Sequence, residues 1–173
     1  LFSSAWGDLD LDYLQSFADW DDPQEVPLPL TEEVHAHAFI EGSPPAFCNT
    51  TDRALLERIL PAIDHETRTF YRWEQVVTAE EVRRYVQEKA GMDLGEVHAL
   101  VPLVRGPSGR LIRVAIEGAR HSLHVGKELE IRRALSRSHL SSSAFVLDRD
   151  AARRFVLTGA GWGPGVGLCQ IGA

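Results

Sequence analysis

The chain has 173 residues, of which 44% are hydrophobic and 25% are charged, and its formal net charge is −7. These values are typical of a globular domain with one core. They argue against a nucleic-acid-binding protein, which would carry a basic surface, and no apolar run approaches the ~18 residues that a membrane-spanning helix needs.

The first thirty residues place aromatic side chains among acidic ones and end in a proline-rich stretch. Pro23, Pro27 and Pro29 exclude a long regular element there. We expect an extended arm that its aromatic residues hold against the body of the protein. The alternative is that Trp6 or Trp20 stacks on a sugar ring.

Residues 31–41 alternate apolar and polar side chains well enough for a strand, although their Ala and Glu content also allows a helix. In a strand, His35 and His37 would lie on one face, as a metal site requires. Only Cys48 and His65 could add ligands from nearby sequence. We therefore interpret the histidines as surface or packing residues and predict no metal site.

Two helices are predicted in the rest of the first half. Residues 49–52 supply a helix start, the next residues carry an apolar stripe at helical spacing, and Pro61 should end that helix. After an extended aromatic segment at 70–73, Thr78 and Glu81 form a capping box, Val77 and Val82 are placed as its hydrophobic staple, and Gly91 ends the second helix.

From residue 96 the apolar periodicity changes to two. Residues 97–104 and 111–116 flank turn chemistry at 106–109 and predict a β-hairpin, with Pro102 at an edge or a bulge. A third strand follows at 120–125. A short helix is expected at 127–135, a serine-rich loop at 136–143, and two more strands at 144–147 and 154–157.

The two cysteines, Cys48 and Cys169, are too few for a disulfide framework. Two separate buried thiols are the favoured interpretation, and one bridge between them is the alternative.

The last fifteen residues alternate glycine with apolar residues, which is typical of a tightly folded loop and not of a flexible linker. Neither G-x-G-x-x-G nor a Gly-Lys-Ser/Thr ending is present, so a nucleotide phosphate site is a poor interpretation.

This segment resembles a known signature. Residues 161–173 read Gly-Trp-Gly-Pro-Gly-Val-Gly-Leu-Cys-Gln-Ile-Gly-Ala, which is similar to the C-terminal signature of the stage II sporulation protein D family, also called the amidase-enhancer or LytB-like family. Gly109-Arg110, Arg132 and residues 140–145 resemble further blocks of that family. The similarity covers residues 97–173 well and residues 1–96 loosely, and Pro164 stands where the family has His.

The resemblance implies an extracytoplasmic cell-envelope protein that acts on peptidoglycan. Some members are lytic transglycosylases that cleave glycan strands, and others are partners of an amidase. By resemblance the acidic catalytic residue lies upstream of Leu1, so we expect this chain to be the C-terminal part of a larger protein and nominate no catalytic residue in it. We predict a peptidoglycan-binding or peptidoglycan-remodelling protein without a cofactor; whether it is an enzyme stays open. The alternative is a non-enzymatic module that stimulates a cell-wall amidase.

The predicted ligand-binding residues lie in the second half of the chain, as the wall of a substrate groove. Guanidinium groups match the carboxylates of peptide stems, hydroxyls add hydrogen bonds, and a tryptophan offers a face to a sugar ring. Structural roles, as ion pairs for the arginines and as a core anchor for the tryptophan, are the alternatives. The set comprises Arg132, Arg133, Ser141, Ser142, Trp162, Gly163, Gly165 and Gln170.

The chain as a whole is expected to be an α+β protein. Residues 1–95 form an irregular and helical flank or insertion, and residues 96–173 form a β-rich region that closes on the glycine-rich loop. The seam is expected near Gly91 to Gly95, without a long linker.

Overall fold

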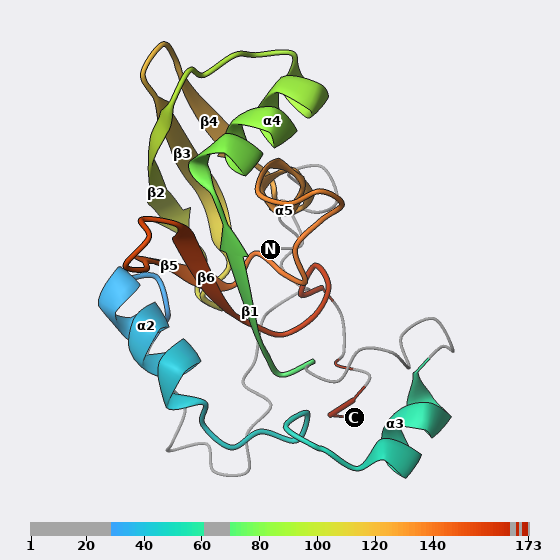
Figure 1. Cartoon of the computed structure of the whole chain (residues 1–173). Helices are drawn as coiled ribbons and strands as arrows, with labels where there is room; N and C mark the ends of the chain where they lie inside the picture. Colours follow the sequence, from blue (N-terminus) through green and yellow to red (C-terminus); the bar gives the residue numbers. More distant parts are fainter. Residues whose placement is uncertain (1–28, 61–69, 167–168, 170, 173) are drawn as a thin grey trace.

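The computed structural model describes residues 29–60, 70–166, 169 and 171–172, and over these residues the fold is α+β, as the sequence predicts (Figure 1). Helices dominate the earlier part of the chain and two small antiparallel sheets the later part. The predicted arm with Trp6 and Trp20 lies outside the described residues. The helices are α2 (Glu33–Gly42), α3 (Arg53–Ile59), α4 (Ala79–Ala90) and α5 (Glu128–Ala134).

The first sheet, called sheet A below, joins distant parts of the sequence. Its strands are β1 (Arg72–Val77), β5 (Phe145–Arg149) and β6 (Phe155–Ala160), in the order β1-β6-β5. The two predicted strands at 144–147 and 154–157 are therefore confirmed as a hairpin. Strand β1, from the predicted aromatic segment, pairs antiparallel with β6, with Trp73 opposite Gly159.

The second sheet, sheet B, is the predicted hairpin with its third strand. It consists of β2 (Val97–Arg105), β3 (Leu111–Gly118) and β4 (Ser122–Gly126) in that order. Pro102 lies on the edge strand β2, and the register shifts between Pro102 and Val104. Pro102 therefore lies on an edge strand and beside a register shift, as predicted. A proline has no N–H to donate to a strand ladder, so it is tolerated at such positions.

One hydrophobic core lies between the two sheets and helices α4 and α5. Phe145 and Leu157 of sheet A, Ile116 of sheet B, Val82 of α4 and Ile131 of α5 are buried in it. The expected seam near Gly91 to Gly95 falls between α4 and β2, and this core contains residues from both sides of it. Burial of such side chains supplies about 1.5–3 kcal/mol each.

The segment 31–41 lies mostly in helix α2 (Glu33–Gly42), so the strand interpretation is wrong and the helical alternative is correct. Ala36 and Ile40 are buried at helical spacing and pack with Val146 of β5 against the face of sheet A opposite the core. Packing of this one face outweighs the local alternation. As a consequence His35 and His37, two positions apart, no longer share a face.

Arg105 ties α2 to both sheets. Its side chain is 2% exposed and pairs with Glu33 of α2 through a 2.6 Å Nη2–Oε1 contact. The same guanidinium donates to the carbonyl oxygens of Gly109, at 2.5 Å, and Phe145, at 3.0 Å. The first turn of α2 is therefore fixed relative to the end of β2 and the start of β5.

The capping predictions are confirmed. Thr78 and Glu81 form the reciprocal capping box at the start of α4, and Gly91 ends the helix in a left-handed conformation. Helix α3 begins after Asp52, whose side chain accepts a hydrogen bond from the Leu55 N–H. No residue of α3 is buried, so the apolar stripe predicted for it does not reach the core. Ile63, the last predicted member of that stripe, and Pro61 lie outside the described residues.

Asp93 joins the end of α4 to sheet B. Its contacts lead us to expect that the stability of the fold depends on the charge of this carboxylate. Its carboxylate accepts from Arg83 at 2.9 Å and from the Gly95 N–H at 3.0 Å, and it also pairs with Arg120. The hydrogen bond from Arg83, followed by that from Gly95, lowers the pKa of Asp93 to about 2.

Because this pKa is depressed in the folded state, the stability that Asp93 contributes is present above its unfolded pKa of about 3.8. It is lost as pH falls toward 2. We therefore expect Asp93→Asn to be less stable than the parent at pH 6 and to differ less from it at pH 2.5, measured by urea unfolding. Equal differences at both pH values would contradict the role of this carboxylate.

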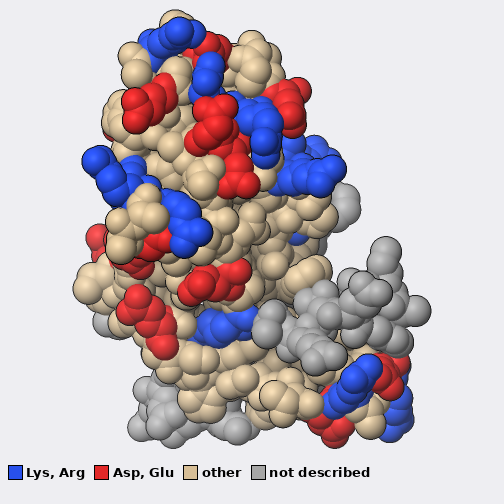
Figure 2. All heavy atoms as spheres, viewed as in Figure 1, with Lys and Arg blue, Asp and Glu red and all other residues tan. Residues whose placement is uncertain are grey.

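Among the described residues, no helix has the length and apolarity needed to cross a membrane. On the face drawn in Figure 2, basic and acidic side chains are intermixed over the region of α4 and α5. The net negative charge is therefore not gathered there into one acidic patch.

Candidate functional site

The glycine loop, here residues 161–166, leaves the end of β6 and is held by backbone hydrogen bonds to two other segments. The Gly161 N–H donates to the Tyr71 carbonyl at 3.0 Å, and the Gly163 N–H donates to the Ser141 carbonyl at 2.8 Å. In return the Trp73 indole N–H donates to the Gly161 carbonyl at 3.1 Å. The loop therefore follows a defined path, as its composition predicts.

Three glycines of this loop adopt left-handed backbone conformations. Gly161, Gly163 and Gly165 have φ values of 73°, 82° and 71°. Such values strain residues that carry a Cβ. Gly159 serves another purpose: it lies in β6, and a Cβ there would come within 2.2 Å of the Trp73 ring. The backbone conformation of the loop therefore requires glycine at 161, 163 and 165, and the packing of Trp73 requires it at 159.

Trp162 presents its ring to solvent from the glycine loop. Its residue is 43% exposed, and its ring meets the buried ring of Phe70 edge to face, with centroids 5.5 Å apart. A core anchor would be largely buried, so the exposed fraction favours the ligand-contact interpretation of this side chain. An exposed indole held by a neighbouring ring offers a flat apolar surface to a sugar or a second aromatic group.

Arg110 lies directly beneath the loop. A Cβ on Gly165 would come within 2.3 Å of its Cζ and Nε atoms, and a Cβ on Gly161 would lie 3.5 Å from its Nη2. The Nε atom is buried and has no hydrogen-bond partner within the described parts of the chain. The loop backbone therefore lies against this guanidinium, and only glycine leaves room for it at position 165.

The charge around Arg110 is incompletely balanced. The Glu128 carboxylate acts electrostatically on Arg110, but both of its oxygens accept hydrogen bonds from Arg132, at 3.1 and 3.4 Å. Burial lowers the pKa of Arg110, and Arg132 lowers it further, while Glu128 opposes them. Glu128 is therefore paired with Arg132, and among the described residues Arg110 is left without a salt bridge.

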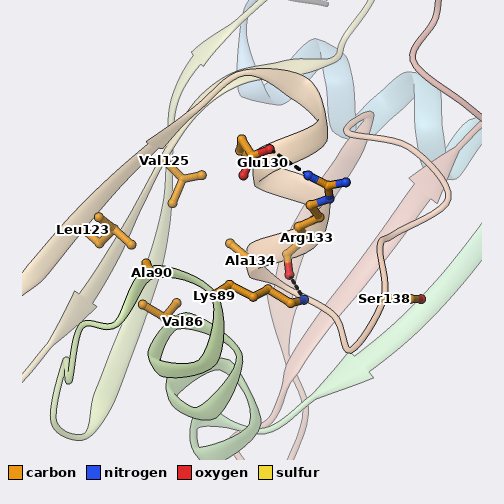
Figure 3. A pocket seen from close by; sticks show the side chains of 9 residues that line it. All are labelled: Val86, Lys89, Ala90, Leu123, Val125, Glu130, Arg133, Ala134 and Ser138. Carbon is orange, nitrogen blue, oxygen red and sulfur yellow. Dashed lines mark hydrogen bonds and ion pairs between the residues drawn. The ribbon is translucent and has the colours of Figure 1, made fainter.

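The predicted arginines have separate positions. Arg132 is buried, and besides Glu128 its Nε donates to the Leu140 carbonyl at 2.6 Å, so its guanidinium is occupied by structural contacts. Arg133 points outward from the same helix and pairs with Glu130 at 3.2 Å. It lies in a different depression, between α4, α5 and sheet B, which Figure 3 shows.

Lys89 is the other basic residue of the Figure 3 pocket. Its Nζ donates to the carbonyl oxygens of Arg133 and Ser136, both at 2.5 Å, just where α5 ends. A cation at this position satisfies the free carbonyl groups and the negative end of the helix dipole. Lys89 thus holds α4 to the end of α5, whereas the guanidinium of Arg133 pairs with Glu130 within α5.

The predicted serines also divide. Ser142 is fully buried; its hydroxyl donates to the Ala160 carbonyl at 2.7 Å and accepts from the Ala144 N–H at 3.2 Å. Ser141 is partly exposed and supplies the carbonyl that holds Gly163. Of the eight predicted residues, Ser141, Trp162, Gly163 and Gly165 come together at the loop, and Gln170 lies outside the described residues.

Cys48 and Cys169 are unbridged thiols. Cys48 is half-buried and Cys169 exposed, whereas the favoured prediction was two buried thiols. They are neighbours: burial raises the pKa of Cys48 to about 11, and the nearby Cys169 thiol contributes to that rise. Cys169 also acts electrostatically on Arg110, so the chain returns to the same site after the glycine loop.

We define the glycine-loop surface as Arg110, Ser141 and residues 161–166. Arg110 is the member that the candidate residues missed. The Gly109-Arg110 pair belongs to the resemblance, and an arginine between the turn residues 106–109 and the apolar run at 111–116 is the signal that the sequence offers. The arrangement can bind an anion at the guanidinium and a flat apolar ring at Trp162.

The chain matches the sequence model of a protein family over most of its length. The sequence model of a family described as "Domain of unknown function (DUF8618)" matches residues 1–167. No curated protein matches the chain significantly.

Proposed function

The chain belongs to the DUF8618 family, whose description states no activity, and on that premise we propose from its own residues that it binds peptidoglycan at the glycine-loop surface. The observation that carries the proposal is the guanidinium of Arg110, whose buried Nε has no hydrogen-bond partner and which forms no salt bridge among the described residues, beneath a loop that exposes Trp162. A ligand that offers both a carboxylate and a sugar ring matches this pair.

Peptidoglycan offers both groups, because its glycan strands carry peptide stems with carboxylates. The resemblance of residues 97–173 to stage II sporulation protein D and LytB-like proteins supports the same ligand and a location in the cell envelope. Glu128, the carboxylate that acts electrostatically on Arg110 within the described residues, is 2% exposed and held by Arg132. This burial favours a binding role for the chain over glycan cleavage by Glu128.

A non-enzymatic role as an amidase enhancer is the second candidate function. The pairing of Glu128 with Arg132 favours this role, because a module that positions a glycan for another enzyme needs no acid of its own. Recovery of an amidase in a pull-down, with no glycan fragments released by the full-length protein, would support this candidate over a lytic transglycosylase.

Sedimentation with purified cell-wall sacculi tests the binding proposal. The parent chain should pellet with sacculi, and Trp162→Ala should weaken the association about tenfold, as expected for an aromatic residue at the centre of a contact. Arg110→Met should weaken it similarly and remove competition by soluble muramyl peptides. Trp162 is exposed, so its replacement leaves the core intact.

Arg133→Ala is the matched control, because Arg133 is exposed and lines the other pocket. It should pellet like the parent. Absence of the parent chain from the pellet would overturn the proposal, and so would equal losses in Arg110→Met and Arg133→Ala, which would indicate charge-driven adsorption only.

A further inference from the structure

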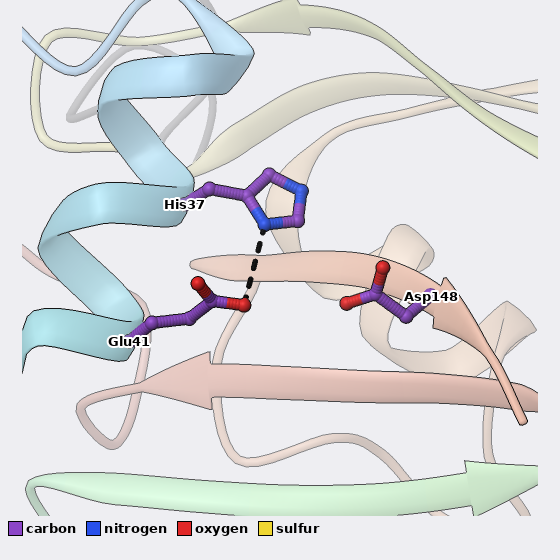
Figure 4. Close-up of side chains that lie close together, drawn as sticks. All are labelled: His37, Glu41 and Asp148. Carbon is purple, nitrogen blue, oxygen red and sulfur yellow. Dashed lines mark ion pairs between the residues drawn. The ribbon is translucent and has the colours of Figure 1, made fainter.

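Three potential metal ligands from two elements meet on the side of sheet A opposite the core. His37 and Glu41 lie one turn apart on α2, and Asp148 lies on β5; one ligand atom from each lies within 4.8 Å of the other two (Figure 4). His37 Nδ1 is 3.6 Å from Glu41 Oε1. We propose that these three side chains bind a divalent transition-metal cation, for which Zn²⁺ is the probe.

The packing of α2 explains why the three groups converge. Side chains along a strand alternate between faces, so Asp148 shares a face of β5 with Val146. Val146 is fully buried against Ala36 and Ile40 of α2. His37 and Glu41 follow these two residues in sequence and lie at the border of the same helix face. The ligands are therefore positioned by a packed contact, and Arg105 fixes the start of the helix through Glu33.

The two carboxylates lack basic partners. Within the described residues neither Glu41 nor Asp148 forms an ion pair with Lys or Arg, and His37 is the one titratable group that contacts Glu41. Two nearby carboxylates repel each other in the absence of a cation, and a bound divalent ion would remove that repulsion. Figure 4 shows the imidazole and both carboxylates directed toward a common point.

The ligand set favours a borderline transition metal over Mg²⁺ or Ca²⁺. An imidazole nitrogen suits Zn²⁺, whereas Mg²⁺ and Ca²⁺ prefer shells made of oxygen. Zinc bound at about 2.0–2.2 Å needs tetrahedral ligand atoms about 3.4 Å apart. Glu41 is exposed and His37 partly exposed, so small side-chain rotations can close the remaining distance. Solvent would fill the fourth position, and the ion would join α2 to β5.

Isothermal titration of the full chain with ZnCl₂, after removal of metals by a chelator, tests the site. We expect one Zn²⁺ per chain. His37→Ala, Glu41→Gln and Asp148→Asn should each weaken binding by about tenfold or more, which corresponds to loss of about 1.4 kcal/mol. Zn²⁺ should also raise the melting temperature of the parent and not that of the triple variant, because a ligand that binds only the folded state stabilises it.

His98→Ala is the control, because His98 faces Glu117 at 3.8 Å without belonging to the three-ligand cluster. It should bind Zn²⁺ like the parent. No binding by the parent would overturn the proposal, as would undiminished binding by Asp148→Asn. An equal affinity for Mg²⁺ would contradict the assignment to a transition metal.

Discussion

Arg132→Ala is expected to destabilise the folded protein by about 3–5 kcal/mol, because it leaves a buried carboxylate without its partner. The side chains of Arg132 and Glu128 are only 7% and 2% exposed. The change also removes the hydrogen bond from Arg132 Nε to the Leu140 carbonyl. Urea unfolding at pH 7 would measure the loss as a lower midpoint.

The same variant should recover part of its stability at lower pH. Burial raises the pKa of Glu128, and Arg132 and then Arg110 partly oppose that rise. Removing Arg132 raises the pKa further. A carboxyl group with a raised folded pKa holds its proton more tightly when folded, so stability falls as pH rises from the unfolded pKa of about 4.3 through the folded one. The deficit of Arg132→Ala should therefore shrink between pH 7 and pH 5.

Arg133→Ala provides the comparison on the adjacent residue. Its ion pair with Glu130 is about half exposed on both sides, so its loss should change stability by less than about 1 kcal/mol. Similar losses for the two variants would contradict the assignment of Arg132 to a structural pair. If Arg132→Ala were as stable as Arg133→Ala, weaker binding of Arg132→Ala to sacculi would report recognition. With the expected loss of stability, weaker binding would report damage to the fold.

Gly159→Ala is expected to destabilise the protein by about 1–3 kcal/mol, with the displaced Trp73 as the cause. The added Cβ would lie 2.2 Å from both Cε2 and Cζ2 of that indole, whose residue is 8% exposed. The Trp73 ring would have to turn away from the Phe145 ring, whose centroid lies 6.2 Å from its own. It would also turn away from the Gly161 carbonyl, to which its N–H donates. Thermal unfolding, monitored by tryptophan fluorescence, would show the loss of stability and the changed environment of the Trp73 ring.

Gly42→Ala is the matched glycine control. Gly42 is the last residue of α2 and a Cβ there meets nothing within 4 Å. Stability should remain unchanged or rise by up to about 1 kcal/mol, because alanine reduces the freedom of the unfolded chain. If Gly159→Ala behaved in the same way, the close packing of Trp73 on β6 would be wrong.

The sequence predicted best those elements whose signals are local. The capping box at Thr78, the glycine cap at Gly91 and the turn chemistry before Arg110 each depend on neighbouring residues, and the structure contains all three. For α2 the sequence left strand and helix both open, because the decisive contact, Ala36 and Ile40 against Val146, spans more than one hundred residues.

The candidate site was predictable in part for the same reason. The glycine loop has its own composition, so Trp162, Gly163 and Gly165 could be found from sequence. The pairing of Glu128 with Arg132 instead of Arg110 could not, because it depends on which guanidinium reaches the carboxylate in three dimensions. The three side chains of the proposed metal site could not be grouped from sequence either, because Asp148 reaches His37 and Glu41 only through the packing of α2 on β5.

The pairing of β1 with β6 has a consequence for the order of folding. Arg72 pairs with Ala160 and Val77 with Phe155, and the chain between them builds α4, sheet B and α5. During synthesis β1 has no neighbour until β6 leaves the ribosome, whereas α4 and the β2-β3 hairpin can form from local contacts. Closing so long a segment is slow. The central strand of sheet A is thus the last to arrive, and until then the edges of β1 and β5 remain open to other chains.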